Sequence, residues 1–516
     1  MRWVNWPLAK YGWIPATILL SAGVLRVALA WSGGQYFFGD EERYDRGIQL
    51  YFAIAHGDLP AVRQIAALPE HALFPWIGAL VTAGQHGLAQ FTPYGTWENP
   101  GSAVLTIKLG AVLLSLFSTA NLFLTHRLAR IAGGTPEEAN WALLLMAASN
   151  TAFYYARHLL PYECAITSAL LALVLGLQTP TAWRGFACGI FAGACYHLYN
   201  GYWYLVPVVW SIYVATNWRR ADRARLWFSC TAGLLAAMLV PMGIGWAAGG
   251  PRYFQLMVSF SQSVTQGAFA EGWSLPWEYL WHSEMSGGAF VAAAFGGAVL
   301  LTFHHGSKLP SRVRGALSVL VALCLLLGLF SAGLKIFVVY ARTVKPWIPV
   351  LCLLGGWALA TLSTAFPSLR RIATLAIVLL AAINFAPHFT RVFPRETEIA
   401  VLRSVGNPKR ALSVSGSLYI PLALPVARPD LALVNAQLIY PARDYLGFPT
   451  GETLLKVTHP LSYPPFQYES HHPRERQLMR EHDISMRLIK LTSPRDLPDH
   501  PPPELLYRSA DRPTGR

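Results

Sequence analysis

A run of acidic residues follows the first long apolar segment of the chain. The segment spans residues 13–31, and Asp40, Glu41 and Glu42 come shortly after it. Membrane proteins rarely place ionisable residues beside an apolar span without using them. A carboxylate can take a proton from a reacting hydroxyl that lies within hydrogen-bond reach. The run therefore indicates an enzyme that works at the membrane surface, and the alternative is a solvated start to a loop.

The composition is that of a polytopic membrane protein. Of the 516 residues, 53% are hydrophobic and 13% are charged, whereas a soluble domain has roughly 25% charged residues. The formal net charge is +14, but the basic residues form short clusters between apolar runs, so the charge does not indicate nucleic-acid binding. The six cysteines lie in or beside apolar runs without a CxxC pair, which is typical of small buried residues rather than disulfides or metal ligands.

Eleven apolar segments are candidates to cross the membrane, for which about 20 apolar residues are needed. They are 13–31, 101–124, 137–156, 163–178, 185–198, 201–217, 226–247, 288–304, 316–334, 346–364 and 372–390. Every second loop between them is basic, namely 125–136, 179–184, 218–225, 305–315 and 365–371. The positive-inside rule then places these loops and the N-terminus in the cytoplasm.

The opposite side carries the long loops 32–100 and 248–287 and the tail. Within the first loop, residues 71–88 are moderately apolar and predict an interfacial or re-entrant helix. In the tail, apolar runs such as 411–414, 431–434 and 484–491 are separated by Gly and Pro and predict strands.

The predicted fold is thus an α-helical polytopic membrane protein of about eleven transmembrane helices in residues 1–390. A small extracytoplasmic α/β domain follows in residues 391–516, and its end, from about residue 493, is expected to be disordered.

Several motifs resemble the GT-C glycosyltransferases, in particular the branch that contains protein O-mannosyltransferases and the lipid A aminoarabinose transferase. The first-loop pattern of that branch is matched by Asp40-Glu41-x-Arg43-Tyr44, Gly57-Asp58-Leu59-Pro60 and Leu73-Phe74-Pro75-Trp76. The stretch from Arg157 to Glu163 resembles its second outer turn, and the stretch from Tyr340 to Pro349 resembles its late Arg-Pro segment. The resemblance covers roughly residues 1–390 and implies a GT-C-like membrane domain.

The resemblance also implies an activity and a base. The enzyme would take a sugar from a polyprenyl-phosphate donor and transfer it, with inversion, to an extracytoplasmic lipid, glycan or protein. Asp40 is expected to be the general base that deprotonates the acceptor. Glu41 is expected to orient Asp40, to bind the acceptor or to hold a divalent ion. A divalent metal is the only cofactor considered, with Asp40, Glu70 and His71 as candidate ligands.

A departing lipid phosphate needs cations. Arg342 and Lys345 lie together at an outer helix end, and Lys335 is a third candidate. The alternative for Arg342 and Lys345 is that they snorkel to the interface.

Four further residues are expected to bind substrate: Tyr44, Arg157, Glu163 and His197. Arg157 and Glu163 have an alternative as a structural pair that closes a turn. His197 has an alternative as an interfacial histidine with satisfied hydrogen bonds.

Two other functions stay open. A transporter or flippase of a lipid-linked glycan predicts charged residues in mid-span and repeat symmetry, whereas the acids lie in outer loops and Arg26 and Lys108 are the main in-span charges. An oligosaccharide ligase or polymerase would share the donor but lack the first-loop pattern. The expected location is a bacterial inner membrane, with the active site and the tail on the periplasmic side and membrane lipids as neighbours.

Overall fold

The structure is a computed structural model, and it describes residues 13–32, 42–89, 100–265, 309–334 and 341–390, four strands of the tail, and the single residues Glu284 and Gly296. The helices before residue 200 are α2 (Trp13–Ser32), α3 (Glu42–Ala55), α4 (Leu59–Ala66), α5 (Phe74–Ala89), α6 (Pro100–Ile131), α7 (Pro136–Ala148), α8 (Asn150–Tyr155), α9 (Tyr162–Leu177) and α10 (Ala182–Leu198). Those after it are the 3₁₀ turn η2 (Asn200–Tyr202), α11 (Leu205–Asn217), α12 (Arg223–Gly249), α13 (Pro251–Thr265), α16 (Ser311–Gly328), the π-helical turn η4 (Leu329–Gly333), α17 (Ala341–Val344), α18 (Trp347–Ala365) and α19 (Pro367–Thr390).

Helices occupy the predicted spans throughout the described residues. Six of the described helices are long and apolar enough to cross a membrane: α2, α6, α12, α16, α18 and α19. The helices α9, α10 and α11 stand at three further predicted spans but have 16, 17 and 13 residues, fewer than the roughly 20 of a full span. The predicted span 288–304 lies outside the described residues apart from Gly296. The chain is an integral membrane protein, and the predicted number of eleven spans stays a prediction.

The predicted span 137–156 is divided into α7 and α8 at Ser149. The Ser149 hydroxyl accepts a hydrogen bond from the amide of Ala152 at 3.2 Å and donates one to Glu284 at 2.8 Å. The Glu284 carboxylate also accepts from the amides of Asn150 and Thr151, at 2.8 and 3.2 Å. These bonds satisfy the free N–H groups that begin α8, so a new helix can start here inside the protein.

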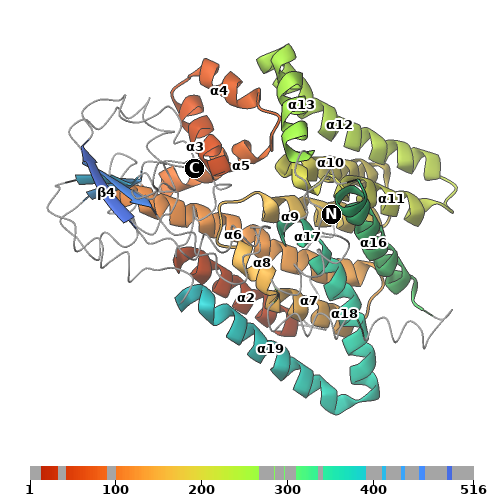
Figure 1. Cartoon of the computed structure of the whole chain (residues 1–516). Coiled ribbons are helices and arrows are strands. Elements are labelled where there is room, and N and C mark those ends of the chain that lie inside the picture. Colours follow the sequence, from red (N-terminus) through yellow and green to blue (C-terminus); the bar gives the residue numbers. More distant parts are fainter. Residues whose placement is uncertain are drawn as a thin grey trace.

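The core lies where α6, α7, α9, α16 and α18 pack together (Figure 1). In α18, 67% of an 18-residue apolar stretch is buried inside the protein, whereas in α12 and α19 the buried share of such a stretch is 22% each. Thus α18 is an inner helix, whereas α12 and α19 leave most of their apolar surface for lipid. Proline opens four of the helices, where its missing N–H costs nothing: Pro100, Pro136, Pro251 and Pro367.

The first loop folds into three helices, α3, α4 and α5, and α5 stands where an interfacial helix is predicted at 71–88. Two glycines set the distance between α3 and α5. A Cβ atom on Gly47 would lie 2.6 Å from the Cα of Gly78, and one on Gly78 would lie 2.9 Å from the Cα of Gly47. The two backbones therefore touch at this crossing, and no larger residue fits at either position.

The described strands of the tail form one four-stranded sheet in the order β2-β1-β3-β4. Its strands are β1 (Arg410–Ser413), β2 (Ala432–Asn435), β3 (Thr453–Thr458) and β4 (Ser485–Lys490). The strand β1 pairs in parallel with β2 and β3, and β3 pairs antiparallel with β4. The runs predicted as strands at 411–414, 431–434 and 484–491 are confirmed, and β3 is an addition. The rest of the predicted α/β domain, including the end for which disorder is predicted, lies outside the described residues.

Candidate active site

Segments far apart in the sequence meet around Arg342 of α17. The Arg342 guanidinium, which is half-buried, donates from Nη1 to the hydroxyl of Tyr162 at 3.0 Å. The hydroxyl of Tyr202 donates to the Arg342 carbonyl at 2.9 Å, and that of Tyr204 donates to the carbonyl of Thr343. The tyrosines thus hold both the side chain and the backbone of this short helix against the start of α9 and η2.

Lys345, three residues after Arg342, forms a buried ion pair with Glu163. The two side chains are 1% and 6% exposed. The second carboxylate oxygen of Glu163 accepts from the Asn121 amide at 2.7 Å, and the Thr167 hydroxyl donates to the Asn121 carbonyl oxygen at 2.7 Å. The Lys345 ammonium also lies 4.6 Å from the ring centroid of Tyr155. This network ties α6, α9 and the start of α18 together.

His71 precedes α5 and is bound to η2 by two hydrogen bonds. The His71 amide donates to the Asn200 side-chain oxygen at 2.7 Å, and the Asn200 amide donates to His71 Nδ1 at 3.2 Å. The ring is buried and stacks on Tyr199 with centroids 5.1 Å apart. The backbone of His71 has a φ of 52°, in the left-handed region. A residue other than glycine uncommonly adopts this conformation. Here two hydrogen bonds and a stacking contact hold His71 in it.

Arginines surround His71. Glu70 pairs with Arg43 at 3.3 Å and with Arg46 at 2.9 Å, both on α3. Burial, followed by the positive charges of Arg43, Arg46 and Arg342, holds the pKa of His71 well below its usual value of 6.5. His71 is therefore neutral at pH 7. Because Nδ1 accepts a hydrogen bond, the ring proton is on Nε2, which lies 3.6 Å from Glu70 and has no hydrogen-bond partner among the described residues.

We call Arg43, Arg46, Glu70, His71 and Arg342 the arginine cluster. It contains three arginines, and its carboxylate, Glu70, pairs with Arg43 and Arg46. Such a group at a helix end favours an anionic ligand, and guanidinium groups match phosphate oxygens in pairs.

Some of the remaining predicted site residues lie outside the described residues, and the others are buried in the protein. Asp40, Glu41 and Lys335 lie outside the described residues, although Asp40 is only two residues before the start of α3. Tyr44 is buried on α3 with its ring 6.5 Å from that of Phe74.

Arg157 and His197 bind to protein backbone. Arg157 donates to the carbonyl of His388 at 2.8 Å, while Glu163 pairs with Lys345 rather than with Arg157. His197 Nε2 bonds to the Met238 carbonyl at 3.2 Å. The substrate roles predicted for both residues stay predictions.

No group of three His, Cys, Asp or Glu side chains able to hold a metal occurs within the described ranges. His71 has its Nδ1 committed to Asn200, so only Nε2 is left for a metal. A divalent ion held by His71 and Asp40 stays a prediction.

Sequence reasoning missed Arg46, Asn200, Tyr162 and Tyr202 as parts of the site. Arg43 and Arg46 are three residues apart on α3, and side chains at that spacing lie on one helix face. That spacing was the available signal for the pair. No comparable signal exists for Asn200, which lies 129 positions from His71.

No protein-family model and no curated protein matches the chain. Solved structures do match it. ArnT from Cupriavidus metallidurans bound to undecaprenyl phosphate has 13% identity and a TM-score of 0.53 over 86% of this chain and 93% of that one. The apo form of the same ArnT has 12% identity and a TM-score of 0.46 over the same shares.

The Archaeoglobus fulgidus oligosaccharyltransferase with a tethered acceptor peptide has 10% identity and a TM-score of 0.45 over 95% of this chain and 75% of that one. ArnT is a GT-C glycosyltransferase, so the likeness to its undecaprenyl-phosphate complex confirms the resemblance at the level of fold. The chain has a GT-C membrane fold.

Proposed function

We propose that this protein is a membrane glycosyltransferase that takes a sugar from a polyprenyl-phosphate donor. The observation that supports this most is the arginine cluster, where three cations and a neutral imidazole converge at one end of a GT-C fold. The similar ArnT structure is bound to undecaprenyl phosphate, which is the ligand chemistry that such a cluster suits.

The cluster would hold the donor phosphate. Arg342, Arg43 and Arg46 would face the phosphate oxygens and oppose the charge that builds as the sugar leaves. His71 would donate from Nε2, a buried N–H without a hydrogen bond among the described residues. An unmet buried donor costs about 1–3 kcal/mol, so a ligand oxygen at this position would relieve that cost. Glu70 would keep Arg43 and Arg46 together when no ligand is bound.

Asp40 would be the general base. The acceptor hydroxyl attacks the anomeric carbon, and its proton passes to the Asp40 carboxylate as the new C–O bond forms. The bond between the anomeric carbon and the phosphate oxygen breaks on the opposite face, and its electron pair leaves with the lipid phosphate. Such a displacement inverts the anomeric centre. The oxocarbenium-like transition state is also stabilised by nearby carboxylates, and Glu41 is the candidate for that role.

The ion pair of Glu163 with Lys345 would act as a positioning device. Lys345 was predicted to bind the donor phosphate and Glu163 to bind substrate, but each charge already has a buried partner inside the protein. We assign them to holding the short helix α17, so that Arg342 stays in contact with Tyr162. Lys335 remains a candidate phosphate ligand.

The arginine cluster would face the extracytoplasmic side. Arg342 of the cluster lies just before the N-terminal end of α18, while Arg370 and Arg371 of the predicted cytoplasmic loop lie just after its C-terminal end. Since α18 is long and apolar enough to cross the membrane, the positive-inside rule supports a location of the cluster outside.

The direct test is transfer by the purified full-length protein in nanodiscs, together with mass spectrometry of cell-envelope lipids and glycans from cells with and without the gene. We expect one glycoconjugate to be lost without the gene, and polyprenyl phosphate to be released in vitro when donor and acceptor are supplied. Cells whose lipid-linked glycans merely accumulate on one side of the membrane would instead support a flippase, and unchanged glycans would contradict the proposal.

A further inference from the structure

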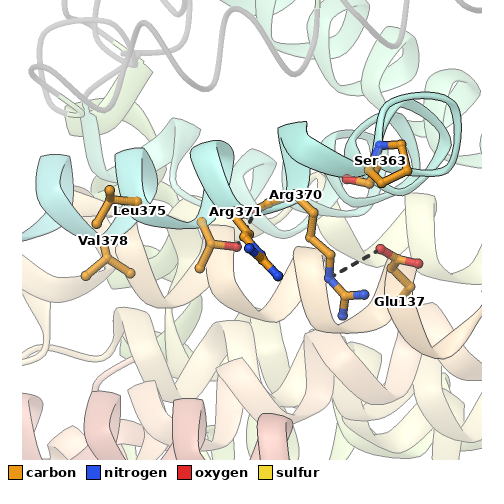
Figure 2. A pocket seen from close by; sticks show the side chains of 8 residues that line it. Glu137, Ser363, Arg370, Arg371, Leu375 and Val378 are labelled. Carbon is orange, nitrogen blue, oxygen red and sulfur yellow. Dashed lines mark hydrogen bonds and ion pairs between the residues drawn. The ribbon is translucent and has the colours of Figure 1, made fainter.

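A pocket of about 740 Å³ lies at the end of α18 that is remote from the arginine cluster. At about 1.5 Å rise per residue, Ser363 is about 24 Å along α18 from Trp347 at its start. Figure 2 shows the pocket between the first turn of α7, the last turn of α18 and the first turns of α19. We call it the inner-end pocket. The proposed glycosyl transfer makes no use of it.

Two arginines give the pocket its charge. Arg370 meets Glu137 at 3.8 Å, with the two side chains 56% and 35% exposed. A pair that long and that exposed contributes little, so Arg370 can turn toward another anion. Arg371 is exposed and forms no ion pair with any carboxylate in the described part of the chain. The pocket therefore has more positive than negative charge.

Ser363 supplies a second and independent feature of a binding site. Its side chain is 6% exposed, it lines the pocket, and its hydroxyl has no hydrogen-bond partner among the described residues. The neighbouring hydroxyls behave differently. Thr361 and Thr364 each donate to a carbonyl one turn back, at 2.9 Å. Buried polar groups are nearly always hydrogen-bonded, so the Ser363 hydroxyl is available to a ligand oxygen.

The remaining lining residues are Pro367, Thr374, Leu375 and Val378, and Thr374 is the polar one among these four. Leu375 and Val378 lie further along α19 and are 71% and 50% exposed. Leu375 follows Arg371 by four positions, so the two side chains share one helix face. This face starts with cations at the helix end and continues with apolar side chains toward the middle of the membrane. A phospholipid matches this arrangement, because its anionic headgroup would lie at the cations and its acyl chain would lie along the apolar side chains.

We propose that the inner-end pocket binds one anionic phospholipid of the leaflet that meets this end of α18. Its phosphate would contact Arg370 and Arg371, an oxygen would accept from Ser363, and an acyl chain would follow Leu375 and Val378. Basic pockets between transmembrane helices are a general setting for anionic headgroups. The bound lipid would fasten α7, α18 and α19 together at the end opposite the arginine cluster.

Native mass spectrometry of the full-length protein in detergent tests this, with phosphatidylglycerol and phosphatidylcholine of identical acyl chains. We expect one phosphatidylglycerol to be retained in preference to phosphatidylcholine. Removing one arginine, as in Arg371→Gln or Arg370→Gln, should weaken retention about five-fold. Ser363→Ala should weaken it about two- to twelve-fold, the value of a single hydrogen bond. Arg219→Gln, which removes an exposed arginine from another basic loop, should match the wild type.

Three results would overturn the proposal. The first is equal retention of the two lipids. The second is an unchanged preference for phosphatidylglycerol in an Arg371→Gln variant that melts like the wild type. The third is displacement of the lipid by equimolar inorganic phosphate together with unchanged lipid retention in Leu375→Gln, which would identify the ligand as a free anion. Neither readout depends on sugar transfer, so failure here leaves the proposed glycosyltransferase activity untouched.

Discussion

The buried pair of Glu163 and Lys345 and the arginine cluster around His71 use charge in opposite ways. The pair is closed, because each charge has its partner and Asn121 completes the hydrogen bonding. In the cluster, Glu70 pairs with Arg43 and Arg46, and the imidazole stays neutral with an Nε2–H that has no hydrogen bond among the described residues. Arg342 and Lys345, three residues apart, connect the two. A buried ion pair positions helices, whereas arginines gathered beside a buried N–H donor suit an anionic ligand.

Breaking the buried pair is expected to have the largest effect on stability. Lys345→Met leaves the Glu163 carboxylate buried without its cation, which typically costs about 3–5 kcal/mol. The double variant Lys345→Met with Glu163→Leu removes both charges and should regain most of that loss. Denaturant unfolding of the detergent-solubilised protein measures both values. A single variant that unfolds like the wild type but no longer binds donor would make Lys345 a phosphate ligand instead.

Removing the base should spare stability and abolish transfer. Asp40→Asn keeps the size of the side chain but cannot accept the acceptor proton, and loss of a general base costs about 10²–10⁴ in rate. Glu42→Gln, in the same acidic run, is the matched control and should keep activity. Single-turnover assays and melting curves of both variants provide the test. Near-normal turnover in Asp40→Asn would remove Asp40 from the mechanism.

Separating α3 from α5 should loosen the arginine cluster without changing any of its residues. Gly78→Ala places a Cβ atom 2.9 Å from the Cα of Gly47, and overpacking of this kind costs about 1–3 kcal/mol. Because α3 carries Arg43 and Arg46, donor affinity should fall as well. Gly84→Ala on the same helix meets its nearest atom at 3.9 Å and should be neutral. Equal melting temperatures for the two variants would show that the crossing can adapt.

The smallest expected effect is on pH dependence. The pKa of His71 is lower in the fold than in the unfolded chain, so below about pH 6.5 the unfolded state binds a proton first and stability falls as pH falls. Above that pH the residue contributes no dependence. The wild type should therefore lose about 1 kcal/mol more than His71→Asn between about pH 7.5 and pH 5.5. Parallel stability curves for the two proteins would mean that the imidazole can be protonated in place.

Local sequence signals predicted the helices well and the site only in part. Apolar length and basic loops located α2, α6, α12, α16, α18 and α19 because a span depends on residues that are neighbours in the chain. The break at Ser149 was not predictable in this way, since the carboxylate that caps α8 comes from Glu284, 135 positions away.

Contacts between residues far apart in the sequence also explain why the site was predicted only in part. Arg342 was identified from a motif within one segment, but its contact with Tyr162 spans 180 positions. Lys345 was expected to face a ligand because its sequence neighbourhood is that of a helix mouth, and its partner Glu163 is 182 positions away. The start of α9 meets the segment from Arg342 to Lys345 only in the folded chain, and short motifs do not encode such contacts.

Donor binding by Arg342 variants tests the central claim most directly. Binding of undecaprenyl phosphate to the purified protein in nanodiscs should weaken in the order wild type, Arg342→Lys, Arg342→Ala, because lysine keeps the charge but loses the planar fork. Arg219→Ala should bind like the wild type, and melting temperatures should change little since Arg342 is only half-buried. If Arg342→Ala binds undecaprenyl phosphate as tightly as the wild type does, the arginine cluster is not the donor site.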